Sequence, residues 1–261
     1  LWQWTALMHG GNHNGRGHVP PYFNAIEREI LGLCSPEVID SDGTYSLEPV
    51  HIGGKAYRID TEHPDEYFLL ECRSGERWDS KVGGSGMLIY HIDKSDRNSG
   101  YSDYYGYDIT ALRRWTVANE VNCRPDHQCA DLLEADGRQD SFSAEESELF
   151  RTSLSSINGI FFPYSGTDSI TPDGKPGLTY WSGEKSKATI TNIRWENGKI
   201  AFSVIGFSEF TTPPEVKSIS HEVFPDAAII NFESNRAFEG NAVVSWGRTG
   251  KEMESMTVRS Y

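Results

Sequence analysis

The sequence predicts an α+β fold, mostly antiparallel β with two or three short helices, followed by a second, smaller all-β domain. From about Val38 onward, runs with a two-residue hydrophobic period recur along the chain. Glu196-Asn-Gly198 separates two of these runs, which is typical of a tight hairpin. Twelve prolines and 25 glycines in 261 residues leave little room for long helices.

The first elements follow from local signals. Residues 1–20 are rich in Trp, Gly and His and are expected to form a loop. A short helix should begin at Pro20-Pro21, place Ile26 and Ile30 on one face, and end at Gly32. Strands are expected near 45–51, 55–60, 66–73 and 86–93. Alternation along the last of these puts His91 and Asp93 on the same face.

The middle of the chain has weaker signals. Residues 94–110 are expected to form a polar, tyrosine-rich loop that is too long for a simple hairpin. A strand or buried turn is expected at 129–134, a capped helix at 143–150, and irregular structure over 151–180. Strands at 188–195 and 199–206 then close a first domain that spans residues 1–207.

A linker signal, Thr212-Pro-Pro214, precedes strand-like runs at 215–220, 226–233 and 241–247. This pattern suits a fibronectin-III-like sandwich, which needs about 100 residues. Only 48 residues follow Pro213. We therefore expect residues 208–261 to form a partial, incomplete sandwich.

Composition excludes several classes of partner. The formal net charge of −14 argues against a nucleic-acid or anionic-membrane surface. No apolar run approaches the roughly 20 residues that span a bilayer. We expect a monomer. Four cysteines, without a C-x-x-C pair, exclude a zinc ribbon. Cys123 and Cys129 could close a small disulfide loop, or all four thiols, including Cys34 and Cys72, could be free.

Few residues form a recognisable catalytic or metal motif. His9, His13 and His18 lie in a glycine-rich stretch that disfavours a shared helical metal site. The chain contains no H-E-x-x-H motif. Asp93 could hold the His91 imidazole in one tautomer, or His91 could be a structural residue at a strand end. Glu134 and Asp136 are candidate calcium ligands, or residues of a turn.

Several segments, in order, resemble the M6 (immune inhibitor A-like) secreted zinc metallopeptidases. They are Trp4-Thr-Ala-Leu-Met8, Gly11-Asn-His-Asn-Gly15, the Pro21–Gly32 segment, Glu66-Tyr-Phe-Leu-Leu-Glu71, Gly86–Asp93, Ala130–Gly137 and the Ile190–Phe202 strand pair. The resemblance covers about residues 1–206. It departs from the family in one respect, because the zinc-binding helix precedes the W-x-L-M segment in these enzymes and is not in this chain.

The resemblance implies that this chain is the C-terminal portion of a zinc endopeptidase's catalytic domain, inactive alone, whose intact parent binds zinc and cleaves protein or peptide substrates. Met8 would then be the Met-turn residue, an apolar floor beneath the zinc ion. Trp4, His91 and Asp93 would be residues of the site wall or structural residues. The resemblance also implies a secreted or cell-surface location, in a bacterium.

Two other hypotheses about the function of this chain remain. The chain could be a non-catalytic, β-rich surface module that binds glycan or protein, with exposed aromatic residues forming a sugar-stacking platform. The candidate platform residues are Tyr101, Tyr104, Tyr105, Tyr107 and Trp115. It could also be a degenerate peptidase that has lost its zinc motif.

Overall fold

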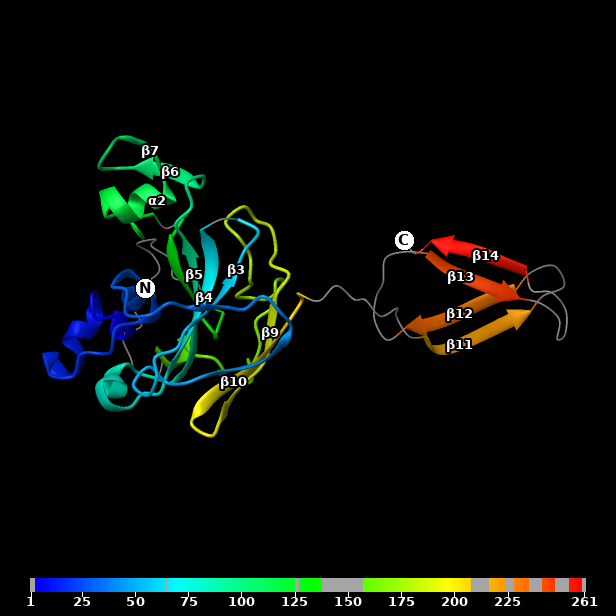
Figure 1. Ribbon diagram of the computed structural model, residues 1–261, viewed down its shortest axis with the longest axis horizontal. Coiled ribbons are helices and arrows are strands. Elements are labelled where there is room, and N and C mark those ends of the chain that lie inside the picture. The colour runs from blue at the N-terminus through cyan, green and yellow to red at the C-terminus, as the bar shows by residue number, and fades with distance from the viewer. Residues whose placement is uncertain are drawn as a thin grey trace. The chain divides into compact units, whose positions relative to one another are not determined.

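A five-stranded sheet lies at the centre of the first part of the chain, as the computed structural model in Figure 1 shows. The structure describes residues 3–63, 65–124, 127–137 and 157–207, and the strands at 216–223, 228–234, 241–246 and 254–259. Contacts within the chain divide it into two units, Leu1–Ser208 and Glu209–Tyr261.

The central sheet has the strand order β1-β3-β4-β5-β8. Its strands are β1 (Glu37–Val38), β3 (Tyr57–Asp60), β4 (Glu66–Arg73), β5 (Gly86–Asp93) and β8 (Ala130–Leu133). β1 is parallel to β3, and every other neighbouring pair in this sheet is antiparallel. Short helices accompany the sheets, so the expected α+β fold, mostly antiparallel β, is confirmed.

A second sheet has the order β2-β10-β9, with all pairs antiparallel. It consists of β2 (Gly43–Leu47), β10 (Lys199–Ile205) and β9 (Thr189–Glu196). Between β9 and β10, Asn197 and Gly198 have φ of 50° and 76°. A type I′ turn needs two residues with positive φ, so the hairpin expected from Asn-Gly is confirmed.

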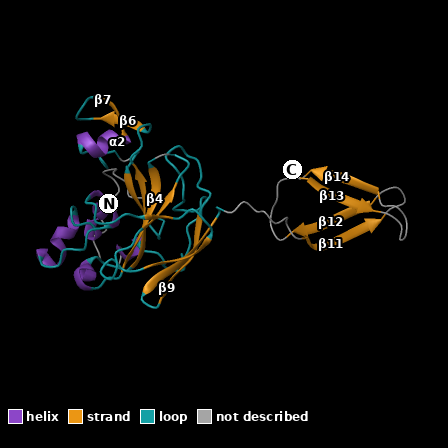
Figure 2. Cartoon of the chain, viewed as in Figure 1, coloured by secondary structure: helices purple, strands orange, loops and turns teal. Residues whose placement is uncertain are grey.

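The central sheet is buried on both faces, and its alternation follows the sequence. Phe68, Leu70 and Ile89 lie on the face that packs against Ile200 and Phe202 of the second sheet. The opposite face, with Leu69, Leu88 and Tyr90, packs against α1 and the segment around Phe161. Figures 1 and 2 show the N-terminal helical segment on one side of β4 and β5, and β9 and β10 on the other.

The first α-helix begins later than expected. α1 spans Ala25–Ile30, because the side chain of Asn24 accepts from the Glu27 amide at 2.8 Å while the Glu27 carboxylate accepts from the Asn24 amide at 2.9 Å. This reciprocal capping starts a helix more strongly than the two prolines do. Gly32 has φ of 68°, as a C′ residue requires. The expectation that Ile30 lies on the apolar face was wrong, since its side chain is exposed.

Among the described residues, the other helical pieces are short: η1 (Gln3–Thr5), η2 (Gly10–Gly17), η3 (Arg77–Lys81), α2 (Ala111–Arg113), the π-helical η4 (Arg114–Ala118) and η6 (Asn158–Ile160). The expected loop over the glycine-rich stretch is thus η2, whose helical geometry is interrupted over Asn14–Arg16.

The region 94–110 is not a simple loop. It contains a two-stranded hairpin of β6 (Ser99–Ser102) and β7 (Tyr107–Thr110). The expectation failed because the whole segment was assigned to one loop, whereas a hairpin occupies residues 99–110 and only the residues before it are irregular. The helix expected at 143–150 lies outside the described residues.

In the second unit, β11 (Val216–Val223) pairs with β12 (Ala228–Ser234), and β13 (Asn241–Trp246) pairs with β14 (Glu254–Arg259). Both pairs are antiparallel. The assignment of this unit to a fibronectin-III-like sandwich stays a prediction.

Candidate functional site

The segment from Trp4 to Gly11, here called the Met8 turn, is a tightly held turn with one exposed apolar side chain. The amides of His9 and Gly11 donate to the Ala6 carbonyl at 3.3 and 3.0 Å. The Met8 amide donates to Glu27 Oε1 of α1 at 2.8 Å. A Cβ at Gly11 would lie 2.4 Å from the Ala6 oxygen, so only glycine fits there.

The Met8 side chain itself is 82% exposed. Within the described ranges, no part of this chain covers Met8. Trp4 is half-buried and packs against the apolar cluster on this face of the sheet, and its carbonyl accepts from Asn14 Nδ2 at 2.8 Å. These contacts are those of a structural residue.

A buried charged network, here called the Arg73 network, lies beneath the Met8 turn. Nε and Nη2 of Arg73 donate to the two Asp79 oxygens at 2.7 and 2.5 Å. Nη1 donates to the Thr5 carbonyl at 3.0 Å, and Nη2 donates to the Tyr22 carbonyl at 3.2 Å. Nη1 also contacts Glu71 Oε1 at 3.4 Å. All five N–H groups of the guanidinium thus have an acceptor.

Glu71 connects the Arg73 network to two further residues. Its Oε1 accepts from the Tyr90 hydroxyl at 2.7 Å, and its Oε2 lies 3.4 Å from Arg28 Nη2. Burial would by itself lower the pKa of the Arg73 guanidinium, but Glu71 and Asp79 outweigh it and raise that pKa. Burial, and then the charge of Glu71, raise the pKa of Tyr90. Both groups therefore keep their protons at every physiological pH.

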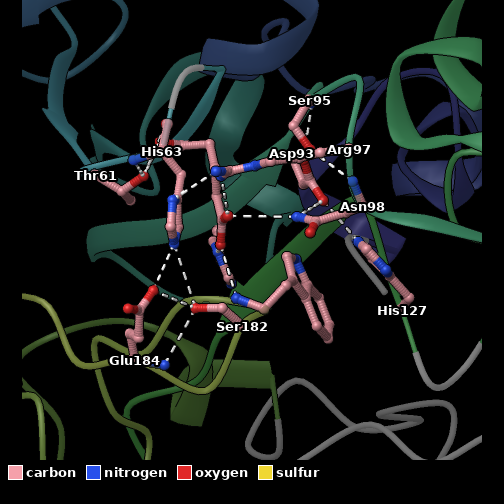
Figure 3. A network of polar contacts seen from close by, with 12 residues as sticks. Thr61, His63, Asp93, Ser95, Arg97, Asn98, His127, Ser182 and Glu184 are labelled. Atoms are coloured by element: carbon pink, nitrogen blue, oxygen red, sulfur yellow. Dashed lines mark hydrogen bonds and ion pairs between the residues drawn. The ribbon is translucent and has the colours of Figure 1, made fainter.

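A second polar centre, here called the Glu66 network, lies at the end of β5 where β4 begins (Figure 3). Glu66 and Asp93 are directly paired across the two antiparallel strands, and both carboxylates are buried. Two like charges opposite each other destabilise a sheet unless each is compensated. Asn98 Nδ2 contacts both carboxylates, at 3.4 Å from Glu66 Oε2 and 2.8 Å from Asp93 Oδ2.

Each carboxylate of the pair also has its own histidine. His91 Nε2 donates to Glu66 Oε1 at 2.9 Å, and His127 Nε2 donates to Asp93 Oδ2 at 2.7 Å. The sequence suggested that Asp93 could hold the His91 imidazole. In the structure, Glu66 holds it instead. Burial alone would raise the pKa of Asp93, but hydrogen bonds from His127, Ser95 and Asn98 outweigh it and lower that pKa.

Trp181 and His63 extend the Glu66 network toward the surface. The Trp181 ring stacks on His91 and on His127, with centroids 5.3 and 4.4 Å away, and its amide donates to Glu66 Oε1 at 2.7 Å. Arg97 Nη1 donates to His63 Nδ1 at 2.6 Å, so the proton of His63 is on Nε2, which donates to Glu184 at 2.6 Å. Ser182 Oγ lies 3.4 Å from that Nε2 but donates to Glu184. The arrangement fixes imidazole tautomers and supplies no activated nucleophile among the described residues.

The two centres lie on opposite faces of the central sheet. His91 shares its face with Met87 and Ile89, and contacts Phe68, in the core between the two sheets. The Met8 turn and α1 cover the other face. His91 and Asp93 thus lie on the face opposite the Met8 turn. His91 bonds the buried Glu66 carboxylate, and Asp93 is itself a buried carboxylate that His127 bonds. Glu66, His127 and Arg73 carry these networks. Glu66 and His127 bond residues distant in sequence, and Arg73 bonds the distant carbonyls of Thr5 and Tyr22 as well as its sequence neighbours, so no local motif marks the three.

The remaining candidate residues do not converge. Within the described ranges, no group of three or more His, Cys, Asp or Glu side chains could hold a metal ion, and this includes Glu134 and Asp136 as well as His9, His13 and His18. All four cysteines are free. Trp115 is not part of an exposed platform, because it packs against the core and its Nε1 donates to the Asp93 carbonyl at 2.7 Å.

The described part of the chain contains no helix that is both long and apolar enough to cross a bilayer. Comparisons with protein-family models, with curated proteins and with solved structures find no match to this chain.

Proposed function

We propose that this chain is part of an M6-like secreted zinc metalloendopeptidase, in which Met8 lies beneath the zinc ion. The observation that carries the proposal is the Met8 turn, where a largely exposed thioether is held on a backbone that Glu27 and Arg73 fix. In this proposal another element of the parent protein covers that side chain, and the fixed turn would let it do so without a backbone change. The order of the sequence segments that resemble the family supports the same assignment.

The residues of this chain do not fit a zinc site by themselves. Its sequence has no H-E-x-x-H motif, and the described residues offer no group of three ligands. In this proposal the zinc ligands belong to a segment that precedes Leu1, and this chain supplies the Met8 turn and the β scaffold. No catalytic step is assigned to a residue of this chain. Secretion or cell-surface display, a monomeric state and bacterial origin belong to the same proposal.

The test uses a longer protein that includes the residues before Leu1. We expect it to bind zinc and to cleave unfolded casein in a reaction that a chelator stops, whereas the 261-residue chain with added zinc should show no such cleavage. In the longer protein, Met8→Leu should retain most activity, because the two side chains have similar volumes. Met8→Ala should lower it.

The matched control is Leu33→Ala, which removes another exposed apolar side chain, one that lies just after α1 and outside the Met8 turn. It should leave activity and zinc content unchanged. The absence of zinc in the longer protein, or equal effects of Met8→Ala and Leu33→Ala, would contradict the proposal.

A second candidate function is glycan or protein binding by the β6–β7 hairpin. Tyr101, Tyr104 and Tyr107 are exposed on this hairpin, Tyr104 by 77%. Arg124 lies over the Tyr101 ring at 5.3 Å, and Asp103 is paired with Arg124. Exposed rings beside charged hydrogen-bonding groups are typical of sugar sites. Calorimetric titration with soluble chitin and cellulose oligosaccharides, in wild type and Tyr104→Ala, tests it, and equal heats in both proteins would exclude the hairpin.

A further inference from the structure

The Arg73 network ties the Met8 turn, at Thr5, to the segment just before α1, at Tyr22. The guanidinium of Arg73 donates to the carbonyl of Thr5, three residues before Met8, and to the carbonyl of Tyr22, just before the Asn24 cap. The Tyr22 amide is held as well, because it donates to Asp79 Oδ1 at 3.1 Å. The backbone of Tyr22 is therefore bound on both its donor and its acceptor, by the two charged partners of one ion pair.

These contacts use the shape of arginine and not only its charge. Five N–H groups point to five acceptors that belong to four residues, and the side chains of Arg73, Glu71 and Asp79 are fully buried. A lysine ammonium has three donors on one atom and cannot reach acceptors on several sides of a planar fork. A network that served only to neutralise Glu71 and Asp79 would not need bonds to the carbonyls of Thr5 and Tyr22.

We propose that Arg73 is the positioning residue of the Met8 turn, an inference that rests on the proposed function for the role of Met8. Arg73 fixes the backbone of the turn at Thr5 and of the segment before α1 at Tyr22. Glu27 fixes the Met8 amide, so the position of the Met8 side chain relative to the sheet is set by these contacts. Arg73 acts through the backbone of the turn and does not contact zinc or substrate.

The test uses methyl-labelled methionine in the 261-residue chain, which has four methionines. Met8 reports on the turn, and Met87, which is fully buried on the opposite face of the sheet, is the internal reference. Arg73→Lys should shift and broaden the Met8 methyl resonance and leave that of Met87 in place. It should also speed hydrogen exchange of the Gly11 amide by roughly tenfold, since local opening of the turn becomes easier.

Two further variants keep the test decisive. Asp79→Asn removes the anchor of Arg73 while preserving side-chain shape, and should give the same Met8 shift if Arg73→Lys does not fold. Arg194→Lys, at an exposed arginine of β9 that bonds only within its own strand, is the matched control and should change neither readout.

An unchanged Met8 resonance and Gly11 exchange in both Arg73→Lys and Asp79→Asn would overturn the positioning role. Equal shifts of Met8 and Met87 would also overturn it, because they would indicate a general loosening of the structure. Neither outcome depends on zinc or proteolysis, so failure of this inference is distinguishable from failure of the proposed peptidase function.

Discussion

The exposure of Met8 makes a quantitative prediction about the cost of truncating it. Full burial of a methionine side chain stabilises a protein by about 1.5–3 kcal/mol. Met8 is 82% exposed, so about one fifth of that gain is realised in this chain, roughly 0.3–0.5 kcal/mol. Met8→Ala should therefore lower the free energy of unfolding of the 261-residue chain by no more than about 0.5 kcal/mol.

The same substitution at Met87 is the matched comparison. Met87 is fully buried between the sheets, and its replacement by alanine leaves a cavity. Met87→Ala should cost about 2–5 kcal/mol. In the longer protein proposed above, Met8 should be covered, and Met8→Ala should then also cost about 2–5 kcal/mol.

The assay is urea unfolding of the first unit, followed by tryptophan fluorescence. A loss above about 1.5 kcal/mol for Met8→Ala in the 261-residue chain would refute the exposed position of Met8, given the usual range for surface changes. An equally small loss in the longer protein would refute the idea that another element covers Met8.

Three further outcomes are expected. Asp93→Asn should destabilise the chain by about 1–3 kcal/mol at pH 7. Because the pKa of Asp93 is lowered in the folded state, the stabilisation by its carboxylate is present above the unfolded pKa and is lost as pH falls through the folded pKa. The free energies of unfolding of wild type and variant should therefore converge in acid. Gly198→Ala should cost about 1 kcal/mol in thermal unfolding, because the position has φ of 76° although there is space for a methyl group, and an unchanged midpoint would contradict the type I′ turn. At pH 8 a thiol reagent should modify exposed Cys123 quickly, whereas Cys72 and Cys129, buried and with pKa raised by burial to about 12, should react only on unfolding, as peptide mapping would show.

Much of the scaffold could be predicted from the sequence because its signals are local. The strands at 66–73 and 86–93 and the facing of their side chains follow from a period of two, which the pleat of a strand imposes on each residue independently of its partners. The Asn197-Gly198 turn follows from two positive φ values, which are a property of those two residues.

The partners of the buried charges were decided only by tertiary structure. Asp93 is the nearest carboxylate to His91 in sequence, but the antiparallel register places Glu66 diagonally across from His91, and Glu66 accepts the hydrogen bond from the imidazole. Asp93 is bound instead by His127, from the loop before β8. A carboxylate buried by the sheet must be compensated by whatever donor the fold brings to it, and that donor is not encoded by spacing.

The same limit applies to the Met8 turn. The sequence marks Met8 and the glycines around it, but the side chain's exposure depends on what lies above it, and the turn's geometry depends on Arg73, which is distant in sequence from Thr5 and Tyr22. Local residues determine which conformations a segment can adopt, whereas long-range contacts determine which of them is kept and which side chains remain uncovered, because only those contacts offset the entropy of ordering the segment.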